Sequence, residues 1–152
     1  MYSRGVTTSD DLLRLENQLC FALVTAARNV VAIYRPILEP LGLTHPQYLV
    51  MLALWERAPR TLNDLAVDLA LEPATASPLV KRLEVEGLVV RQRSNEDERR
   101  LEISLTDAGA ALRERALDVP HQVMTAVRMD VAEISALRDG LGAFAGRRPD
   151  LG

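Results

Sequence analysis

The chain is poor in the residue types that usually carry chemistry. It contains one cysteine, two histidines and 4% aromatic residues. A single cysteine excludes a disulfide framework within the chain and favours a reducing compartment such as the cytoplasm. The two histidines are isolated, and neither a metal-ligand spacing nor a Ser/His/Asp grouping is apparent. We therefore expect no metal, no cofactor and no enzymatic activity.

Long apolar runs are also missing. No unbroken stretch of about eighteen apolar residues occurs, which predicts that no segment spans a membrane. Residues 1–5 lack the apolar core of a signal peptide, so we expect a cytoplasmic protein. The scarcity of aromatic rings provides no stacking platform for single-stranded nucleic acid.

What is present suits a globular protein. The 152 residues, 48% of them apolar, predict one chain-length domain, 1–152, with a real core. The net charge of −3 argues mildly against nucleic acid, but its distribution favours it, because the surface that meets phosphate is what counts. Within the middle of the chain the basic residues gather at Lys81, Arg82, Arg91, Arg93, Arg99 and Arg100.

Residues 44–106 have the pattern of a winged helix-turn-helix. Thr61 can cap a helix, the next helix starts near Glu72-Pro73, and Gly87 ends it. Two short apolar strands, 88–90 and 101–105, follow and enclose a polar, arginine-rich hairpin tip. This unit places its second helix in the DNA major groove and its wing along the backbone or the minor groove. The alternative for the hairpin is a solvated face of mixed charge.

Helical patterns flank this unit on both sides. We predict a long helix from Ser9 to about Arg35, broken by Pro36, and helices after Thr106 and Asp130, with Pro120 kinking the first of these. The N-terminal helix carries two apolar stripes where a surface helix needs one, which indicates a second copy of the chain on the extra face. The predicted fold is mainly α with a small β wing, and residues 9–38 and 107–145 form a helical dimerisation region.

These patterns carry a family resemblance. The wing motif Asp97-Glu98-Arg99 and the run Leu105-Thr106-Asp107-Ala108-Gly109 resemble the MarR family of bacterial transcription regulators, over residues 10–145. The runs 15–23, 34–36, 46–51, 78–84 and 118–120 resemble its organic-hydroperoxide sensors, the OhrR subgroup, and its one-cysteine branch in particular. The chain departs from that subgroup where His45 and Val24 replace tyrosines.

The resemblance implies that Cys20, Tyr34 and His45 form a redox-sensing site. From its position alone, Cys20 would more often be a small buried hydrophobe. Cys20 and Tyr34 are fourteen residues apart on the predicted helix, or about 21 Å at 1.5 Å per residue. A hydrogen bond spans about 3 Å, so a Tyr34 that contacts the Cys20 sulfur must belong to the other subunit. Without a second cysteine, an oxidised Cys20 must be resolved by a low-molecular-weight thiol or by another chain.

The same resemblance and the helix pattern identify the residues expected on DNA. Arg99 is expected in the minor groove with Asp97 holding its guanidinium, although a surface ion pair of little energetic value is the alternative. Hydroxyl groups on the second helix give modest base specificity, and its cations hold phosphates. The expected DNA-binding residues are Thr75, Ser77, Pro78, Lys81, Arg82, Arg93, Asp97 and Arg99.

The sequence thus predicts a homodimeric repressor of a palindromic double-stranded operator that releases DNA when an organic hydroperoxide oxidises Cys20. A second hypothesis is a MarR-type repressor released by a small aromatic or acidic ligand in the cleft between the helical hub and the winged helix, with Cys20 structural. A third is an interaction module with a degenerate winged helix, which the acidic net charge would suit.

Overall fold

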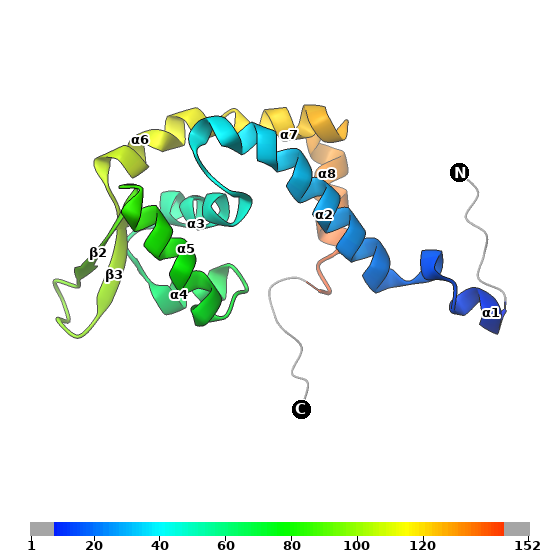
Figure 1. The fold of residues 1–152 in the computed structure, drawn as a ribbon, viewed down its shortest axis with the longest axis horizontal. Coiled ribbons are helices and arrows are strands. Elements are labelled where there is room, and N and C mark those ends of the chain that lie inside the picture. The colour runs from blue at the N-terminus through cyan, green and yellow to red at the C-terminus, as the bar shows by residue number, and fades with distance from the viewer. Residues whose placement is uncertain (1–7, 145–152) are drawn as a thin grey trace.

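The computed structural model describes residues 8–144, and the chain is mainly helical with one small sheet, as predicted (Figure 1). The N-terminal part holds α1 (Ser9–Leu12), the 3₁₀ turn η1 (Leu15–Asn17), α2 (Leu19–Leu38) and η2 (Glu39–Leu41). The middle holds α3 (His45–Glu56), β1 (Arg60–Thr61), α4 (Leu62–Asp68), α5 (Pro73–Val85), β2 (Val89–Arg93) and β3 (Leu101–Leu105). The C-terminal part holds α6 (Asp107–Ala116), α7 (Val119–Val127) and α8 (Val131–Gly140).

The middle part is a winged helix-turn-helix. Its sheet is antiparallel with the order β1-β3-β2; Val89 pairs with Leu105, and Arg60 pairs with Ile103. β2 and β3 form the predicted hairpin, although β2 extends three residues into the expected tip, to Arg93. β1 adds a third strand to the two predicted ones, because a two-residue strand is too short to show alternation in the sequence.

Threonine caps define the helix starts as predicted. The Thr61 side chain accepts from the Asp64 backbone N–H at 3.1 Å, and the Thr106 side chain accepts from the Gly109 N–H at 3.0 Å. Thr44 forms a full capping box with Gln47 at the start of α3. Gly87, with φ of +78°, takes the left-handed conformation that follows α5.

The prediction of one continuous helix from Ser9 to about Arg35 is wrong. The structure has α1 ending at Leu12 and α2 beginning at Leu19 and continuing beyond Arg35. Side-chain amides end the first piece: Asn17 Nδ2 donates to the Asp11 carbonyl at 2.7 Å, and Gln18 Nε2 donates to the carbonyls of Leu12 and Arg14, at 2.8 Å each. These bonds take carbonyls that a continuing helix would use. Thr8, not Ser9, caps α1. At the other end, Pro36 lies inside α2, which continues to the fully buried Leu38.

The C-terminal helices also differ from expectation in one respect. We predicted one helix kinked at Pro120, but α6 ends at Ala116 and α7 starts at Val119, with Pro120 in the first turn of α7. Proline is tolerated there because its missing N–H would be unpaired. Asp130 and Glu133 form a capping box that starts α8, as expected. The predicted end of the ordered chain at Gly146 lies outside the described residues.

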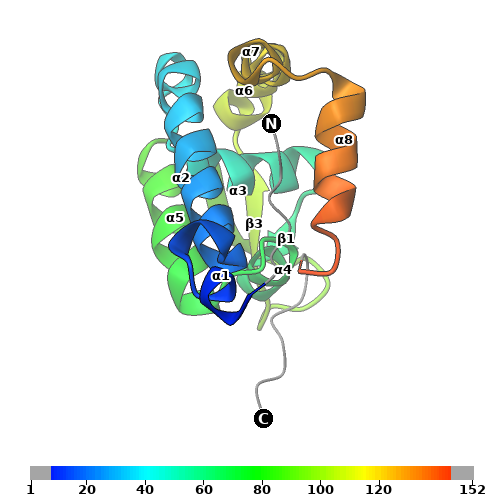
Figure 2. The ribbon, with the colours of Figure 1, turned by 90° about the vertical axis from the view of Figure 1, so that its right-hand side faces the viewer.

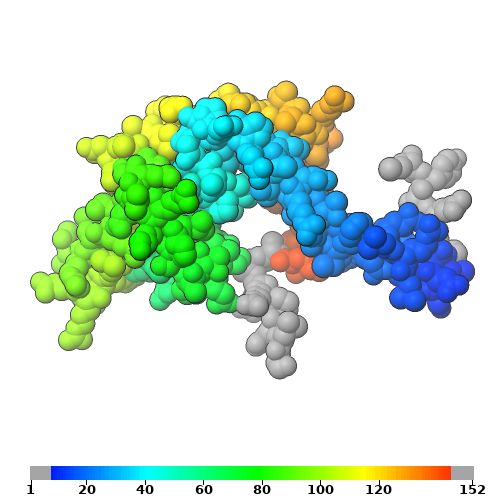
Figure 3. Space-filling model, viewed as in Figure 1, coloured from blue at the N-terminus to red at the C-terminus, as the bar shows by residue number. Residues whose placement is uncertain are grey.

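The core lies in the winged helix and reaches into α7. Leu38, Met51, Leu54, Leu65 and Leu83 are among its largest fully buried side chains. By contrast, the N-terminal half of α2 leaves this body as an arm with a hollow beneath it (Figure 3). Figure 2 shows α2 and α8 as separate columns on either side of α7. The winged helix is therefore compact, whereas α8 and the N-terminal half of α2 contribute nothing to the buried core.

The segment from α1 through α2 exposes apolar side chains that include members of both predicted stripes. Leu19 is 59% exposed and Val24 40%, and Leu12, Leu13, Leu15, Phe21, Val30 and Val31 are exposed as well. By length and composition alone, the segment Leu19–Leu41 is apolar enough to cross a membrane. The absence of an unbroken apolar run in the sequence did not indicate such a segment. Arg28 and Arg35 lie within it. A helix that buries both faces in a protein interface has the same composition.

Candidate DNA-binding face and thiol site

α5 presents the residues predicted to contact DNA along its outer face. Thr75, Pro78 and Lys81 are exposed and Ser77 is half-buried, whereas Ala76, Val80 and Leu83 hold the helix against the core. Arg82 is exposed, but its guanidinium lies 3.8 Å from the Glu86 carboxylate. Of the two cations on α5, Lys81 is thus the one that points outward without an acidic partner among the described ion pairs.

The wing is shaped by contacts between its own side chains and backbone. Arg93 donates to the Glu98 carbonyl at 2.7 Å. Asp97 Oδ1 accepts from the backbone N–H of Arg99 at 2.9 Å, and within residues 8–144 no ion pair joins the two side chains. The expectation that Asp97 holds the Arg99 guanidinium is therefore not met. Asp97 instead fixes the turn that carries Arg99 outward.

Two other arginines of the basic cluster hold the wing to the helices. Arg100 lies 3.4 Å from Asp64 of α4, and Arg91 lies 3.9 Å from Glu84 of α5. The pKa of Asp64 is lowered, first by the hydrogen bond with the Thr61 side chain and to a smaller extent by Arg100. These arginines, counted as a basic patch in the sequence, are partly committed to positioning the hairpin.

Sequence reasoning missed two structural contacts behind the DNA-binding face. Arg60 is buried, pairs with Asp68 and donates to the Arg57 carbonyl at 2.8 Å. The Trp55 indole N–H donates to the Gly109 carbonyl at 2.9 Å, which ties α3 to the start of α6. Gly109 ends the run 105–109 of the family resemblance, so that run could have indicated a close contact there. Nothing in the sequence around Arg60 indicated that its side chain is buried.

Cys20 lies in the first turn of α2 and is exposed. Within a single chain Cys20 therefore lies outside the buried core. Tyr34 lies on the same helix, fourteen residues further along, so the two side chains of one chain are separated by about 21 Å. The sulfur of one chain therefore does not meet its own Tyr34.

Tyr34 and His45, two of the three residues predicted for the redox-sensing site, lie side by side within one chain. Their ring centroids lie 4.9 Å apart in an edge-to-face arrangement, and Tyr48 lies 5.9 Å from Tyr34. Burial raises the pKa of Tyr34 and of Tyr48, and burial lowers the pKa of His45. The cluster thus presents a neutral imidazole and protonated phenols near neutral pH.

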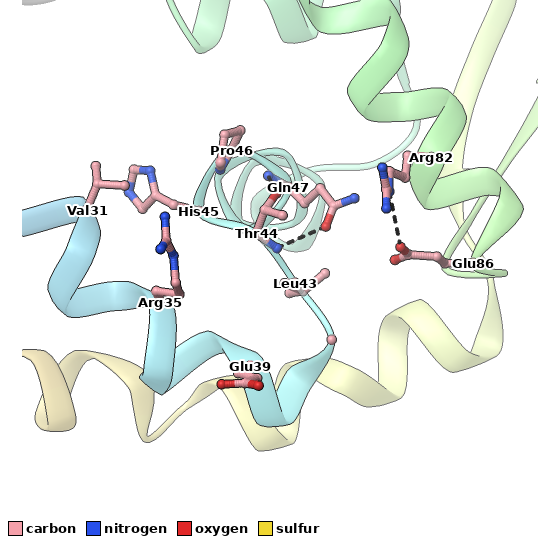
Figure 4. Close-up of a pocket in the computed structure, with 11 residues that line it drawn as sticks. Val31, Arg35, Glu39, Leu43, Thr44, His45, Pro46, Gln47, Arg82 and Glu86 are labelled. Atoms are coloured by element: carbon pink, nitrogen blue, oxygen red, sulfur yellow. Dashed lines mark hydrogen bonds and ion pairs between the residues drawn. The ribbon is translucent and has the colours of Figure 1, made fainter. Parts of the chain in front are cut away.

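A cavity of about 440 Å³ opens beside this cluster, between α2, the start of α3 and α5. Figure 4 shows His45 next to Val31 and Arg35, with Arg82 and Glu86 across the opening. The lining combines apolar side chains with cations and carboxylates; it consists of Val31, Arg35, Glu39, Gly42, Leu43, Thr44, His45, Pro46, Gln47, Arg82 and Glu86. Within the described residues, no group of three or more histidine, cysteine, aspartate or glutamate side chains is placed to hold a metal ion.

Comparison with known proteins gives this arrangement a family. The family model described as transcriptional regulator SarA/Rot matches residues 32–115. The chain is 40% identical to the organic hydroperoxide resistance transcriptional regulator of Bacillus subtilis, over 86% of this chain and 89% of that protein. This chain belongs to the MarR family of DNA-binding transcription regulators.

Solved structures of MarR-type regulators share the fold. Overoxidized AbfR bound to DNA, from Staphylococcus epidermidis, aligns with a TM-score of 0.72 at 35% identity, covering 90% of this chain and 96% of that one. CouR from Rhodococcus jostii bound to p-coumaroyl-CoA aligns with a TM-score of 0.72 at 27% identity, covering 90% and 97%. Regulators of the MarR fold thus include one captured in an oxidised form and one captured with a small ligand.

Proposed function

We propose that this MarR-family chain is a homodimeric, cytoplasmic repressor that binds a palindromic operator and releases it when an organic hydroperoxide oxidises Cys20. The observation that carries the proposal is the exposed Cys20 at the start of the uncovered arm. The similarity to an organic hydroperoxide resistance regulator over most of the chain supports it.

The apolar arm supports a dimer. The described part of residues 9–38 and 107–145 exposes apolar side chains, among them Leu19 and Phe21 on α2, Leu137 on α8 and Phe144 beyond the end of α8. A second copy of the chain that packs on this surface removes it from water. In a symmetric dimer each subunit covers the same surface of the other. Residues 44–106 then form a DNA-binding unit on each side of a helical hub.

In such a dimer the thiol site is shared between subunits. Because Tyr34 lies about 21 Å along the helix from Cys20 of its own chain, an antiparallel crossing of the two α2 helices would bring Cys20 of each chain to Tyr34 and His45 of the other. A phenol O–H or an imidazole N–H can donate a hydrogen bond to a thiolate. The edge-to-face contact of Tyr34 with His45 gives that sulfur two neighbouring donors.

The sensing step follows thiol chemistry. The Cys20 thiolate attacks the terminal peroxide oxygen of ROOH, the O–O bond breaks, and the protonated products are Cys20 sulfenic acid and the alcohol ROH. A low-molecular-weight thiol then attacks the sulfenic sulfur and forms a mixed disulfide, with loss of water. The new group at Cys20 enlarges the side chain at the subunit contact and shifts one arm relative to the other.

Release of DNA follows from spacing. Two recognition helices reach successive major grooves only when they stand one turn, about 34 Å, apart. A dimer whose spacing no longer matches binds with one half-site, which removes most of the affinity.

The test compares wild-type protein with Cys20→Ser on operator DNA, with and without cumene hydroperoxide and a small thiol. Peroxide is expected to release the wild-type protein and to leave Cys20→Ser bound. Intact mass should show the mixed disulfide on the wild-type chain. Release of both proteins, or of neither, would refute oxidation as the signal.

A second candidate rests on the cavity beside His45. Its apolar walls with Arg35 and Arg82 suit a small aromatic carboxylate, and CouR is a relative captured with an aromatic acyl-CoA. In this hypothesis the ligand would separate the helical hub from the winged helix, and Cys20 would have a structural role. Salicylate that releases wild-type protein and Cys20→Ser equally, but not Arg35→Ala, would favour it.

A further inference from the structure

The exposed face of α5 lacks the residues that usually read bases in pairs. Asn and Gln recognise adenine and Arg recognises guanine through two hydrogen bonds each. No Asn or Gln occurs in α5, and its one arginine, Arg82, lies beside Glu86 and lines the cavity. Glu84 lies beside Arg91. Lys81 remains as the one outward cation of the helix, so hydrogen bonding alone gives α5 little power to distinguish base pairs.

Pro78 stands in the middle of this face. A proline in a helix interior is strongly destabilising, because its ring crowds the preceding turn and it lacks a backbone N–H. The usual helical hydrogen bond from residue 78 to the Ala74 carbonyl therefore cannot form. Pro78 is exposed, so core packing does not account for it. Its rigid apolar ring is displayed where the DNA duplex would lie.

Thr75 lies one turn before Pro78 and is also exposed. Residues three apart lie on the same face of a helix, so the Thr75 methyl group and the Pro78 ring face the same way. Both lie in the N-terminal half of α5, the half of a recognition helix that contacts base edges. Thymine is the one base that offers an apolar group, its C5 methyl, in the major groove.

We infer that this regulator selects its operator through the C5 methyl groups of thymines, contacted by the Pro78 ring and the Thr75 methyl group. The inference rests on the DNA binding in the proposed function and adds the chemistry of recognition. Lys81 then supplies phosphate attraction, and the wing supplies the minor-groove contact. The expected half-site has thymine at the positions that α5 covers.

Replacing thymine by uracil tests this directly, because uracil keeps the pairing with adenine and lacks only the C5 methyl. The probe is a duplex of about 30 base pairs, enriched from a random library by the full-length wild-type protein, long enough for two half-sites one turn apart. Each thymine is replaced by uracil in turn, and binding is measured by fluorescence anisotropy. Loss of one buried methyl group should weaken binding about fourfold at the contacted positions.

Two variants assign the contacts. Pro78→Ala should abolish the thymine preference at one position of each half-site and raise the melting temperature, because alanine relieves the helix. Thr75→Ser, which removes only a methyl group, should abolish the preference at a neighbouring position. Val85→Ala is the control: Val85 is 80% exposed but lies at the far end of α5, and the preference should persist.

The possible outcomes distinguish failure of this inference from failure of the proposed function. Equal binding of thymine and uracil duplexes by wild-type protein, or an enriched half-site without thymine, would overturn the inference while leaving a DNA-binding regulator. Persistence of every preference in both variants would overturn the assignment to Pro78 and Thr75. Failure to enrich any duplex would refute the proposed function itself.

Discussion

Gly109 shows how one residue can fix the relation of two elements. A Cβ built on it would lie 2.0 Å from the Leu88 carbonyl oxygen, which is backbone and therefore has little freedom to move. The same carbonyl accepts from the Thr106 backbone N–H at 3.1 Å. The chain thus passes from the wing to α6 through a contact that excludes any side chain.

We therefore expect Gly109→Ala to lower the free energy of unfolding by about 1–3 kcal/mol, the usual cost of forcing extra atoms into a packed site. Urea unfolding followed by circular dichroism measures this. Ala110→Ser, at an exposed position of the same helix, is the control and should cost about 0.5 kcal/mol or less. An equal effect of both substitutions would mean that the Leu88 contact yields without cost.

His45 makes a prediction about pH. Burial lowers its pKa, so the folded protein binds this proton more weakly than the unfolded chain does. Its contribution to stability is therefore complete above the ordinary histidine pKa of about 6.5 and is lost as the pH falls through the lowered value. The groups that surround it include Tyr34 and Arg35.

His45→Gln should therefore lose less stability than wild-type protein when the pH is lowered from about 7.5 to about 5.5. Thermal unfolding at a series of pH values gives the comparison. His121, exposed on α7, provides the matched control, and His121→Gln should retain the wild-type pH dependence. Identical pH profiles for wild-type protein and His45→Gln would show that burial of the imidazole has no energetic consequence.

At the scale of elements, local signals predicted the winged helix and failed at the N-terminus. Thr44, Thr61, Thr106 and Gly87 act within three or four residues of themselves, so the sequence alone reveals their effect. The break at Gln18 depends on amide side chains that reach back four to six residues to carbonyls of the chain. A pattern of apolar spacing does not register such bonds, because it counts only apolar positions.

The candidate site also combines features that the sequence indicated with features that it did not. The family resemblance grouped Tyr34 with His45, and their rings are in contact. The exposure of Cys20 in a single chain was not predicted. The commitment of Arg82, Arg91 and Arg100 to acidic partners could not be predicted, because it depends on how α4, α5 and the hairpin pack together. A count of charges in the sequence therefore overestimated the cations available to DNA.

The wing element gives a prediction for Arg99. Asp97 fixes its backbone, and its guanidinium has no acidic partner among the described ion pairs, so it is available to DNA. Arg99→Ala should weaken operator binding by about 1–3 kcal/mol and reduce the slope of log affinity against log salt by about one. The melting temperature should stay within error, because no fold contact is lost.

Binding titrations at several salt concentrations measure both quantities. Arg138→Ala, an exposed arginine on α8, is the charge-matched control and should bind as wild-type protein does. A folded Arg99→Ala protein with unchanged affinity and salt slope would remove Arg99 from the DNA contact.

At the scale of the whole molecule, the uneven burial of apolar side chains indicates that a partner covers part of the surface. The winged helix holds most of the buried core, whereas α2 and α8 leave Leu19, Phe21 and Leu137 open to water, each at least 45% exposed. Burial of apolar area stabilises by about 25 cal/mol per Å². Because several such side chains are covered in each subunit of a dimer, together they contribute a large share of the free energy of a stable association. Monomer and dimer should therefore differ mainly in these helices.

Phe21→Lys places a charge at this surface, in the turn next to Cys20, and should weaken dimer formation by a factor of about 100 or more, since a buried charge without a partner is costly. Sedimentation over a range of protein concentrations measures the equilibrium. Val67→Lys, at a position of α4 that is 76% exposed, introduces the same charge outside the arm and should leave the dimer intact. Because Phe21 lies outside the buried core, the winged helix of Phe21→Lys should keep its near-ultraviolet circular dichroism from Trp55. A dimer of unchanged strength in this variant would mean that the arm does not form the subunit contact, and the shared thiol site would lose its geometric basis.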